Sequence, residues 1–374
     1  MLKGNGLPVN VLQVIGRLAR GGAEHVILTK CSGIRSRDPS FHFRVLALYT
    51  KDNFADQFTS AGIPVDCLHA SENRQVRALL RTIRYLIIHK PDIVHTHLSG
   101  DRIGQLASAL TGIGRRISTL HNIKQDRSVY ERLTNRMTGI LAHAIVAVSE
   151  SLRDVWVRER GMPAKKMHVI YNAPSFEPPQ QPPIRRRRGA AGVKCVCIGN
   201  LRPVKGHIFA IEAMRDVCRV LPESVLEIYG ADPDGYGAEL EQAIMRWSLA
   251  GKVKLQGPTA DPKQILCGAD IVLMPSVSEG FPLVPVEALS LGVPVVASGL
   301  PIHREILGRD EYGLVVPPQN PAALASAVIR LASDPDLFSA LSRKGIERAR
   351  VFSRENMAAG YLRLYDKLLG RDGG

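Results

Sequence analysis

The sequence predicts an α/β protein with two doubly wound domains, each a parallel sheet covered by helices on both faces. Three observations lead to this fold class. The chain has 374 residues, which is enough for two domains that each bury a core. Short apolar runs alternate with segments of helical periodicity through both halves. A segment rich in proline and arginine, with neither pattern, separates the halves.

The strand-like runs are apolar on both faces, which is typical of parallel sheets buried under helices. In the first half they are 9–15, 43–48, 93–97, 116–120, 145–148 and 168–171, with helical segments at 22–33, 73–89, 104–110 and 127–142. In the second half strands are expected at 194–198, 224–229, 253–256, 271–275 and 294–297, and helices at 207–220, 238–249, 262–267 and 284–291.

These patterns predict four segments of the chain. A first domain occupies 1–175, a linker 176–192, a second domain 193–352 and a final helical segment 353–374. Parallel sheets of this kind bind ligands beyond the carboxyl ends of their strands. Two such domains therefore predict a cleft between their carboxyl edges, with function in the strand-to-helix loops.

Composition excludes several classes of protein. Hydrophobic residues make up 45% and charged residues 22%, so the chain is not globally disordered. We find no apolar run long enough for a transmembrane helix, and the first residues resemble a strand rather than a signal peptide. Six cysteines form no CxxC pair or disulfide framework, and Cys195 and Cys197 are expected to pack inside a strand. We therefore expect a cytoplasmic protein.

The formal charge of +14 is concentrated in the first half. Residues 1–175 hold 25 Lys and Arg against 13 Asp and Glu, whereas residues 176–374 hold 24 against 22. Such a basic half indicates an anionic partner. Within 71–90, four arginines recur at helical spacing beside an apolar stripe: Arg74, Arg77, Arg81 and Arg84, with Val76, Leu79, Leu80, Ile83 and Ile87. This helix is either a solvated face over a core-packed stripe or a contact for anionic lipid. The run Arg185–Arg188 is likewise a solvated linker or a membrane-touching patch.

Three strand-to-helix loops carry candidate chemistry. The first, Gly16–Val26, contains Gly21 and Gly22 at the start of a helix, where backbone can approach a phosphate, and Glu24 in the first turn. GxGxxG and Walker A patterns are missing from it, which argues against nicotinamide enzymes and P-loop nucleotidases. The second loop carries Arg202 and Lys205, a pair suited to a diphosphate or simply two surface cations.

The third loop, Ser276–Pro282, follows an apolar strand. Glu279 within it can accept hydrogen bonds from sugar hydroxyls, and Glu287 lies eight residues later in the expected first turn of a helix. Compensation of the helix dipole explains Glu287 equally well. Backbone N–H groups at Phe281, Leu283 and Val284 are available to an anion, whereas Pro282 has none.

The motifs GGAE, DIVHTH, VAVSES, GNLRPVKG and SEGFPLVPVEALSLGVPVVAS, in this order, resemble those of glycosyltransferase family 4, the retaining GT-B enzymes. The resemblance runs from about residue 9 to residue 370. It implies a GT-B fold of two Rossmann-like domains, with the acceptor bound by the first and the nucleotide-sugar by the second. Residues 353–369 match the family's terminal helix, which crosses back to the first domain. One departure is Ala173, where the family commonly has glycine after asparagine; it puts the usual hinge turn in doubt.

The resemblance also implies roles for individual residues. Arg202 and Lys205 would hold the diphosphate, Glu287 the ribose and Glu279 the donor sugar, and His121 would lie near the sugar's reacting face. The remaining donor contacts would be Gly22, Gly199, Gly230, Gly257, Gly280, Phe281, Leu283 and Val284, with the base near Gly230 and Leu255–Thr259. The acceptor-side candidates are His97 and Arg127.

The expected reaction is retaining transfer of a hexose or N-acetylhexosamine from a nucleotide-diphosphate sugar, with UDP favoured over GDP. The acceptor would be a hydroxyl of a glycan or of a polyprenyl-diphosphate-linked saccharide, in polysaccharide synthesis at the inner leaflet. We expect no cofactor and no metal, because fixed cations and helix N–H groups can stabilise the leaving diphosphate.

Alternative interpretations remain open at this point. The GT-B fold also occurs in nucleotide-sugar 2-epimerases. A non-enzymatic protein that binds anions or nucleic acid would use the basic half, although aromatic residues, at 5%, offer few stacking platforms. The strings Asp232–Asp234 and Asp334–Asp336 could be metal-binding DxD motifs, but Asp-Pro favours turns. His95 and His97 share a strand face, yet no third metal ligand is apparent, and we expect them to line the acceptor site.

Overall fold

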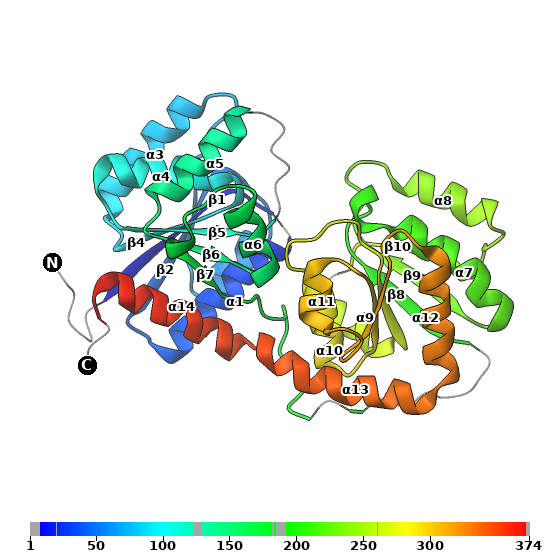
Figure 1. Cartoon of the computed structure of the whole chain (residues 1–374). Helices are drawn as coiled ribbons and strands as arrows, with labels where there is room; N and C mark the ends of the chain where they lie inside the picture. The colour runs from blue at the N-terminus through cyan, green and yellow to red at the C-terminus, as the bar shows by residue number, and fades with distance from the viewer. Residues whose placement is uncertain are drawn as a thin grey trace. The chain divides into compact units, whose positions relative to one another are not determined.

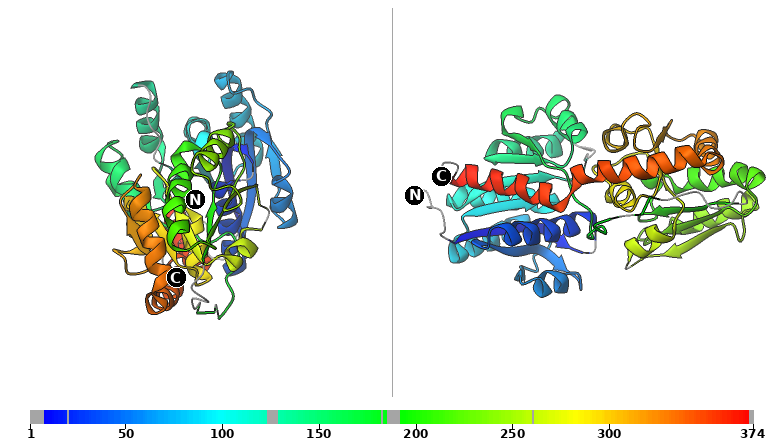
Figure 2. Two further views of the ribbon diagram at one scale, coloured as in Figure 1. Left: turned by 90° about the vertical axis from the view of Figure 1, so that its right-hand side faces the viewer. Right: turned by 90° about the horizontal axis from the view of Figure 1, so that it is seen from below.

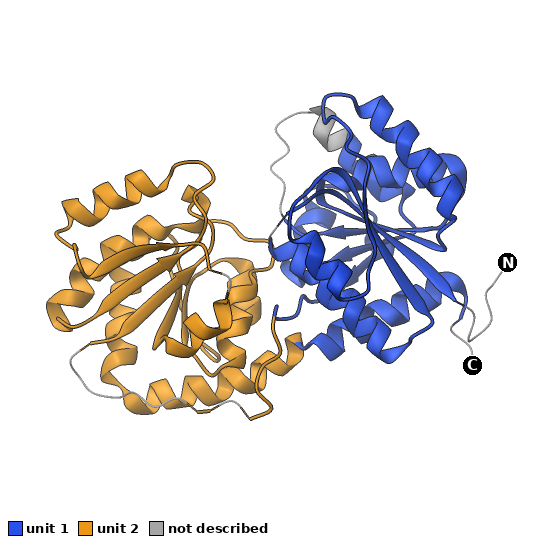
Figure 3. Cartoon of the chain, turned by 180° about the vertical axis from the view of Figure 1, so that it is seen from behind, with its two compact units in different colours: residues 1–175, 353–374 blue, residues 176–352 orange. Residues whose placement is uncertain are grey.

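The computed structural model describes residues 8–19, 21–122, 129–181, 183–184, 192–259 and 261–371. Arg127 and the run Arg185–Arg188 lie outside these residues. The chain forms two compact units (Figure 3): unit 1 comprises Met1–Ser175 and Ser353–Gly374, and unit 2 comprises Phe176–Phe352.

Among the described residues, unit 1 contains a seven-stranded sheet in the order β3-β2-β1-β4-β5-β6-β7, and every paired strand in it is parallel. Its strands are β1 (Val9–Leu18), β2 (Phe41–Lys51), β3 (Val65–Cys67), β4 (Ile93–His97), β5 (Arg115–Leu120), β6 (Ala144–Ala147) and β7 (Met167–Val169). The order reverses direction at β1 and β4, where ligands bind in doubly wound folds.

Helices cover both faces of this sheet (Figure 1). They are α1 (Gly22–Arg37), α2 (Ala55–Ser60), α3 (Gln75–His89), α4 (Asp101–Thr111), α5 (Val129–Leu141), α6 (Glu150–Arg158) and α14 (Arg354–Leu369). α4 packs between α3 and α5 on one face, and α14 packs on α1 (Figure 2, right). Gly33 makes the α1–α14 contact close, because a Cβ there would lie 3.1 Å from Cβ of Ala358.

Unit 2 has a six-stranded sheet among its described residues, in the order β10-β9-β8-β11-β12-β13, again parallel at each pairing. The strands are β8 (Lys194–Ile198), β9 (Val225–Tyr229), β10 (Val253–Gly257), β11 (Ile271–Met274), β12 (Val295–Ser298) and β13 (Leu314–Val316). The helices are α7 (His207–Val220), α8 (Gly237–Arg246), α9 (Pro262–Gly268), α10 (Leu283–Ser290), α11 (Pro301–Leu307), α12 (Pro321–Ser333) and α13 (Pro335–Ala349).

The central strands are buried on both faces, as the apolar runs predict. All four residues of β11 and of β12 are buried, and so are all five of β4 despite its two histidines. The sequence patterns missed the three-residue edge strands β3 and β13, which are too short to show a period. They also missed α2, α6, α11, α12 and α13. At the doubtful hinge, Ala173 is buried and is not among the described residues with positive φ.

Helix α3 is oriented differently from the expectation of a buried apolar stripe. Its fully buried residues are Ala78, Thr82 and Leu86. Three members of the expected stripe instead face solvent, with Val76 71%, Leu80 60% and Ile87 53% exposed. The stripe spans about 100° of the helix at 3.6 residues per turn, and the contact with the sheet and α4 covers only one edge of it.

Candidate functional site

A polar cluster lies beyond the carboxyl ends of β8 and β11 in unit 2. Lys205 ends the 3-10 turn Pro203–Lys205, and Glu279 lies in the loop between β11 and α10. The Lys205 Nζ is 2.8 Å from Oε1 and 3.0 Å from Oε2 of Glu279. The hydroxyl of Ser276 donates to the same Oε1 at 2.8 Å. The Glu279 side chain is 8% exposed and that of Lys205 29%, so this ion pair is partly shielded from solvent.

Backbone contacts between the two loops hold this cluster together. Val277 N–H donates to the carbonyl of Val204 at 2.8 Å. Gly206 has φ +67°, and a Cβ there would lie 2.1 Å from the carbonyl oxygen of Pro275. Only glycine allows this left-handed turn to pass so close to the second loop. Lys205 and Glu279, 74 residues apart in sequence, are therefore brought together by the loops themselves.

A histidine that no sequence motif singles out lies near this pair. His303, on α11, is fully buried, and its Nδ1 donates to the carbonyl of Ser298 at 2.7 Å. Its Nε2 has no hydrogen-bond partner within the described residues. Burial lowers the pKa of His303, the Ser298 contact and the charge of Glu279 oppose that shift, and the charge of Lys205 adds to it. A lone histidine within a short helix gives no sequence signal that would have identified it.

Helix α10 begins directly after this loop. Pro282 is its N-cap and Pro285 its third residue, so Leu283 and Val284 supply the N–H groups of the first turn that are left for an anion. Glu287 lies in the second turn, not the first, and is 3% exposed. Dipole compensation in a first turn therefore does not explain Glu287. Phe281 is buried, with its ring 5.7 Å from that of Phe352.

Three glycines expected on the donor side follow neighbouring strands or end them. Gly199 N–H donates to Tyr229 and Gly230 N–H to Gly257, both at 2.8 Å. A Cβ at Gly230 would lie 1.9 Å from the carbonyl oxygen of Gly199. The structure therefore supplies a packing reason for Gly230, independent of any ligand. Gly280 is buried beside Glu279, in the loop already described.

Arg202 does not join Lys205 in the ion pair with Glu279. Its Nε pairs instead with Asp234 at 3.1 Å, between side chains that are 50% and 59% exposed. In the same string, Asp232 accepts from Gly237 N–H at 3.0 Å. In the other DPD string, Asp334 caps α13 by accepting from Leu337 N–H at 2.9 Å. Asp232 and Asp334 thus have the structural roles that Asp-Pro predicts, and the described residues contain no cluster of three metal-ligating side chains.

In unit 1, the glycine-rich loop leads into α1 at the carboxyl end of β1. Gly21 is the N-cap and Gly22 the first helical residue. Glu24 is buried, and a Cβ at Gly21 would lie 2.6 Å from its Oε2. Burial raises the pKa of Glu24 to about 7, against hydrogen bonds from the backbone of Glu24 and Ala19 that lower it. The charge of Asp52 raises it further.

His121, directly after β5, belongs to a second polar cluster that is almost wholly buried. Its Nε2 lies 3.0 Å from Nδ1 of His97. The Nε2 of His97 lies 2.9 Å from Oε1 of Gln13 and 3.3 Å from Nζ of Lys30. Lys30, on α1, lies 2.7 Å from Gln13 Oε1 and 3.2 Å from Nδ1 of His95. We call these five residues the unit 1 network.

Two tyrosines of helix α14 contact the unit 1 network. The Tyr365 hydroxyl lies 2.7 Å from Nδ1 of His95, and the Lys30 Nζ sits 4.9 Å from the centroid of the Tyr361 ring. Burial lowers the pKa of Lys30 to about 7. His95 is fully buried and His97 is 1% exposed, so neither forms part of a surface that an acceptor could touch, contrary to the expectation for both. His97 lies behind His121, which is 7% exposed.

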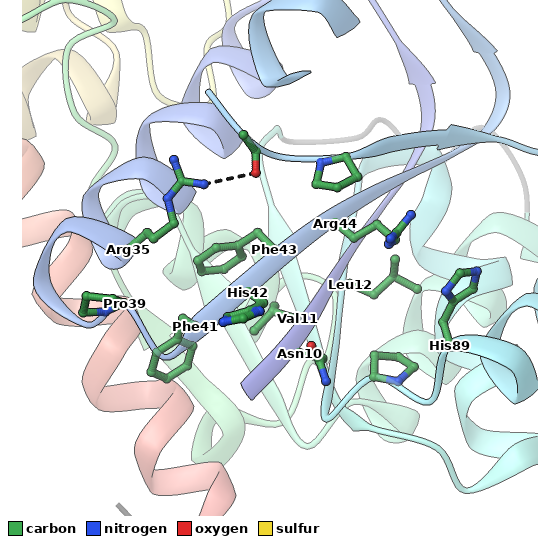
Figure 4. Close-up of a pocket in the computed structure, with 13 residues that line it drawn as sticks. Asn10, Val11, Leu12, Arg35, Pro39, Phe41, His42, Phe43, Arg44 and His89 are labelled. Carbon is green, nitrogen blue, oxygen red and sulfur yellow. Dashed lines mark hydrogen bonds between the residues drawn. The ribbon is translucent and has the colours of Figure 1, made fainter. Parts of the chain in front are cut away.

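A separate pocket of 470 Å³ lies at the opposite, amino-terminal edge of the unit 1 sheet (Figure 4). Its walls include the starts of β1 and β2. The two arginines on its wall are already engaged: Arg35 donates to the carbonyl of Gly62 at 3.1 Å, and Arg44 pairs with Asp66 at 2.7 Å. We assign no ligand to this pocket.

Comparison with known proteins identifies the family. A profile described as Glycosyltransferase Family 4 matches residues 4–174, and one described as Glycosyl transferases group 1 matches residues 192–334. The chain belongs to glycosyltransferase family 4. It is a glycosyltransferase with the GT-B fold, as its two parallel Rossmann-like sheets and its motifs indicate.

Relatives cover nearly the whole chain. The D-inositol 3-phosphate glycosyltransferase of Thermobispora bispora is 25% identical over 98% of this chain and 90% of that protein. The UDP-Gal:alpha-D-GlcNAc-diphosphoundecaprenol alpha-1,3-galactosyltransferase of Escherichia coli is 24% identical over 76% of this chain and 77% of that protein. The crystal structure of Anabaena HepE in complex with UDP has a TM-score of 0.81 at 20% identity, covering 96% of this chain and all of that one.

None of the helices among the described residues is both long and apolar enough to cross a membrane.

Proposed function

We propose that this glycosyltransferase moves a hexose or N-acetylhexosamine from a UDP-sugar to a hydroxyl of a glycan or lipid-linked saccharide, with retention of anomeric configuration and without a metal. The observation that carries the proposal is the cluster of Lys205, Glu279 and Ser276 at the carboxyl edge of the unit 2 sheet, beside the first turn of α10. The Escherichia coli relative, named for transfer from UDP-Gal to a GlcNAc-diphosphoundecaprenol, supports the donor and acceptor classes.

The two parts of the donor, its diphosphate and its sugar, are suited to groups of opposite charge, and the ion pair supplies one of each. Lys205, with Arg202, attracts the diphosphate, while Glu279 accepts hydrogen bonds from sugar hydroxyls. In the free protein each partner satisfies the other at 2.8 Å. A bound donor replaces this contact with two: phosphate oxygens take the ammonium, and hydroxyls take the carboxylate. The ion pair therefore keeps both groups oriented until the donor arrives.

The reaction separates charge, and groups of the proposed site stabilise the negative charge that develops on the leaving diphosphate. As the bond between the anomeric carbon and the phosphate oxygen breaks, negative charge grows on the diphosphate and positive charge on the sugar. Lys205 and the N–H groups of Leu283 and Val284 stabilise the former without reorganisation. The acceptor oxygen bonds to the anomeric carbon on the face that the diphosphate leaves. Its proton passes to a phosphate oxygen of the departing UDP, so atoms and charge balance. Glu287 holds the ribose.

Unit 1 supplies the acceptor side and His121. Its surface also suits an anionic membrane that carries a polyprenyl-linked acceptor. On α3, Val76 and Leu80 are exposed next to Arg77 and Arg84. In amphipathic helices that bind anionic membranes, exposed apolar side chains insert into the bilayer surface while the basic side chains contact the lipid headgroups. Vesicles with and without anionic lipid test this contact by co-sedimentation. We expect binding that falls with salt and with Leu80→Ser, but not with Val220→Ser, an exposed residue of unit 2. Equal binding by all three proteins contradicts a role for α3.

The decisive experiment is a donor panel with separate readouts for binding and transfer. UDP, GDP and their sugar conjugates are first compared by thermal shift, and UDP-linked compounds are expected to stabilise the protein most. Transfer to a polyprenyl-diphosphate saccharide is then measured in EDTA, with NMR of the product to establish the anomeric configuration. Inversion, or complete loss of transfer in EDTA, contradicts the proposed mechanism. Donor consumption without acceptor indicates epimerisation or hydrolysis instead.

A further inference from the structure

The unit 1 network links a buried lysine to His121 through side chains whose hydrogen-bonding roles can be worked out. Its hub is Gln13, in the middle of β1 and fully buried. The amide oxygen of Gln13 lies 2.7 Å from the Lys30 Nζ and 2.9 Å from the His97 Nε2. A carbonyl oxygen only accepts hydrogen bonds. Both nitrogens therefore present a hydrogen to it. The longer contact of 3.3 Å between Lys30 Nζ and His97 Nε2 is then one between two donors and not a hydrogen bond.

This requirement settles the tautomer of His97 and then that of His121. A neutral imidazole carries one N–H, so His97 with its hydrogen on Nε2 has a lone pair on Nδ1. That Nδ1 lies 3.0 Å from the Nε2 of His121. His121 must then donate from Nε2, and its own Nδ1 carries the lone pair. A single acceptor, Gln13, thus determines the hydrogen-bonding character of a residue two side chains away.

The surroundings keep His97 neutral. Burial first, and then the charges of Lys30, His95 and His121, lower the pKa of His97 well below its ordinary value. The other titratable groups packed around the network are Cys31 on α1 and Tyr361 and Tyr365 on α14, and burial raises the pKa of each of them. All three are neutral at neutral pH, and none supplies a negative charge that would favour an imidazolium.

We propose that Gln13 and His97 are positioning residues that hold His121 in its Nε2–H tautomer, so that its Nδ1 accepts a hydrogen bond from a substrate hydroxyl. The final clause rests on the proposed function; the tautomer does not. An Nδ1–H tautomer would instead present a donor to a hydroxyl and allow that hydroxyl to turn its hydrogen elsewhere. Because Lys30 occupies the second position on the Gln13 oxygen, it also prevents the amide from flipping its NH₂ group toward His97.

Nitrogen NMR of the full chain tests the tautomer without any assay of activity. In ¹⁵N-histidine-labelled protein, long-range proton–nitrogen correlations distinguish a protonated from an unprotonated ring nitrogen, and His121→Gln identifies the His121 signals. We expect an unprotonated Nδ1 and a protonated Nε2 in both His97 and His121. An Nδ1–H tautomer at His121, or a rapidly exchanging mixture of both tautomers, overturns the proposal. This outcome is independent of whether the donor is a UDP-sugar.

Substitution of Gln13 tests the link to catalysis. Gln13→Leu removes the acceptor without adding a charge. The matched control is Gln105→Leu: Gln105 is equally buried but donates to Thr96 Oγ1 and the Ile117 carbonyl on the other face of β4.

We expect Gln13→Leu to mix the His121 tautomers and to lower kcat roughly 10-fold with little change in the donor KM, the scale of losing one oriented hydrogen bond. Gln105→Leu should leave the tautomer unchanged. Equal losses of kcat in Gln13→Leu and Gln105→Leu, with the tautomer unmoved, contradict a positioning role. Absence of transfer in the wild-type chain would instead fail the proposed function and leave the tautomer result standing.

Discussion

The two polar clusters of this glycosyltransferase are built in opposite ways. The unit 2 cluster pairs full charges, Lys205 and Glu279, on loops, with the lysine 29% exposed. The unit 1 network places Lys30 and two histidines on a helix and a strand, all within 1% of full burial. Charges that must exchange their partner for a ligand need loops and solvent access. Groups that only orient another residue can be fully buried, because a hydrogen-bonded network in the core holds a fixed geometry.

The largest effect is expected from removal of either charge of the unit 2 ion pair. Lys205→Ala and Glu279→Ala should each lower kcat/KM at least about 100-fold, the scale of losing one positioned electrostatic group. Steady-state transfer kinetics provide the measurement. Lys252→Ala serves as control, because Lys252 donates to the carbonyl of Pro222 at the other edge of the same sheet. Near-normal turnover in either variant would refute its catalytic role.

A smaller effect on stability is expected where the carboxyl edge of unit 2 relies on backbone contact. Gly230→Ala places a methyl group 1.9 Å from the Gly199 carbonyl oxygen, so the ends of β8 and β9 must separate. Overpacking of this kind costs about 1–3 kcal/mol of unfolding free energy. Denaturant unfolding measures it, and Gly268→Ala, where the added Cβ meets nothing within 4 Å, is the control. Equal midpoints for the two variants would argue against close backbone packing at this edge.

The buried lysine of unit 1 should appear in the pH dependence of stability. Its pKa falls from 10.5 to about 7 on folding, so the unfolded chain binds more protons above pH 7. The unfolding free energy therefore rises with pH there, by up to about 1.4 kcal/mol per pH unit from this one group. Chemical unfolding is measured between roughly pH 7 and 8.5. Glu24 affects the slope mainly below this window and Cys31 mainly above it, because their pKa values change on folding in those pH ranges. Lys30→Met should flatten the slope, while Lys252→Met should not. A slope unchanged in Lys30→Met would mean that Lys30 is not buried in the folded chain.

The smallest effect is expected from the exposed ion pair of Arg202. Asp234→Asn removes its partner, and pairs exposed to this degree are worth about 0.2–1 kcal/mol. UDP binding, measured by calorimetry, should tighten no more than about fivefold at low salt and revert to the wild-type value at high salt. A large or salt-independent change would indicate that Asp234 contacts the ligand itself.

The residues whose place in the fold the sequence predicted best are those whose backbone context is local. GNLRPVKG and the loop around Glu279 follow apolar strands, and a strand end in a parallel sheet is a ligand-binding position by topology alone. The position of Glu287 was wrong by one turn, because Pro282 as N-cap starts α10 at Leu283 and the pattern does not mark that residue. For the stripe on α3 the sequence left core packing and lipid contact open, and in the structure Val76, Leu80 and Ile87 face solvent; periodicity gives the width of an apolar face but not which edge of it packs.

The sequence by itself determined the fold class, the family and the residue types that a nucleotide-sugar reaction needs, because these follow from local periodicity and from motifs of adjacent residues. Only the tertiary structure decided which of these residues meet. It pairs Lys205 with Glu279 and Arg202 with Asp234, and places His97 behind His121. It also joins Gln13, Lys30 and His95 with two tyrosines of the last helix. Contacts between residues so far apart in the sequence depend on the spatial order of the strands and loops. Hydrophobic periodicity contains no information about that order.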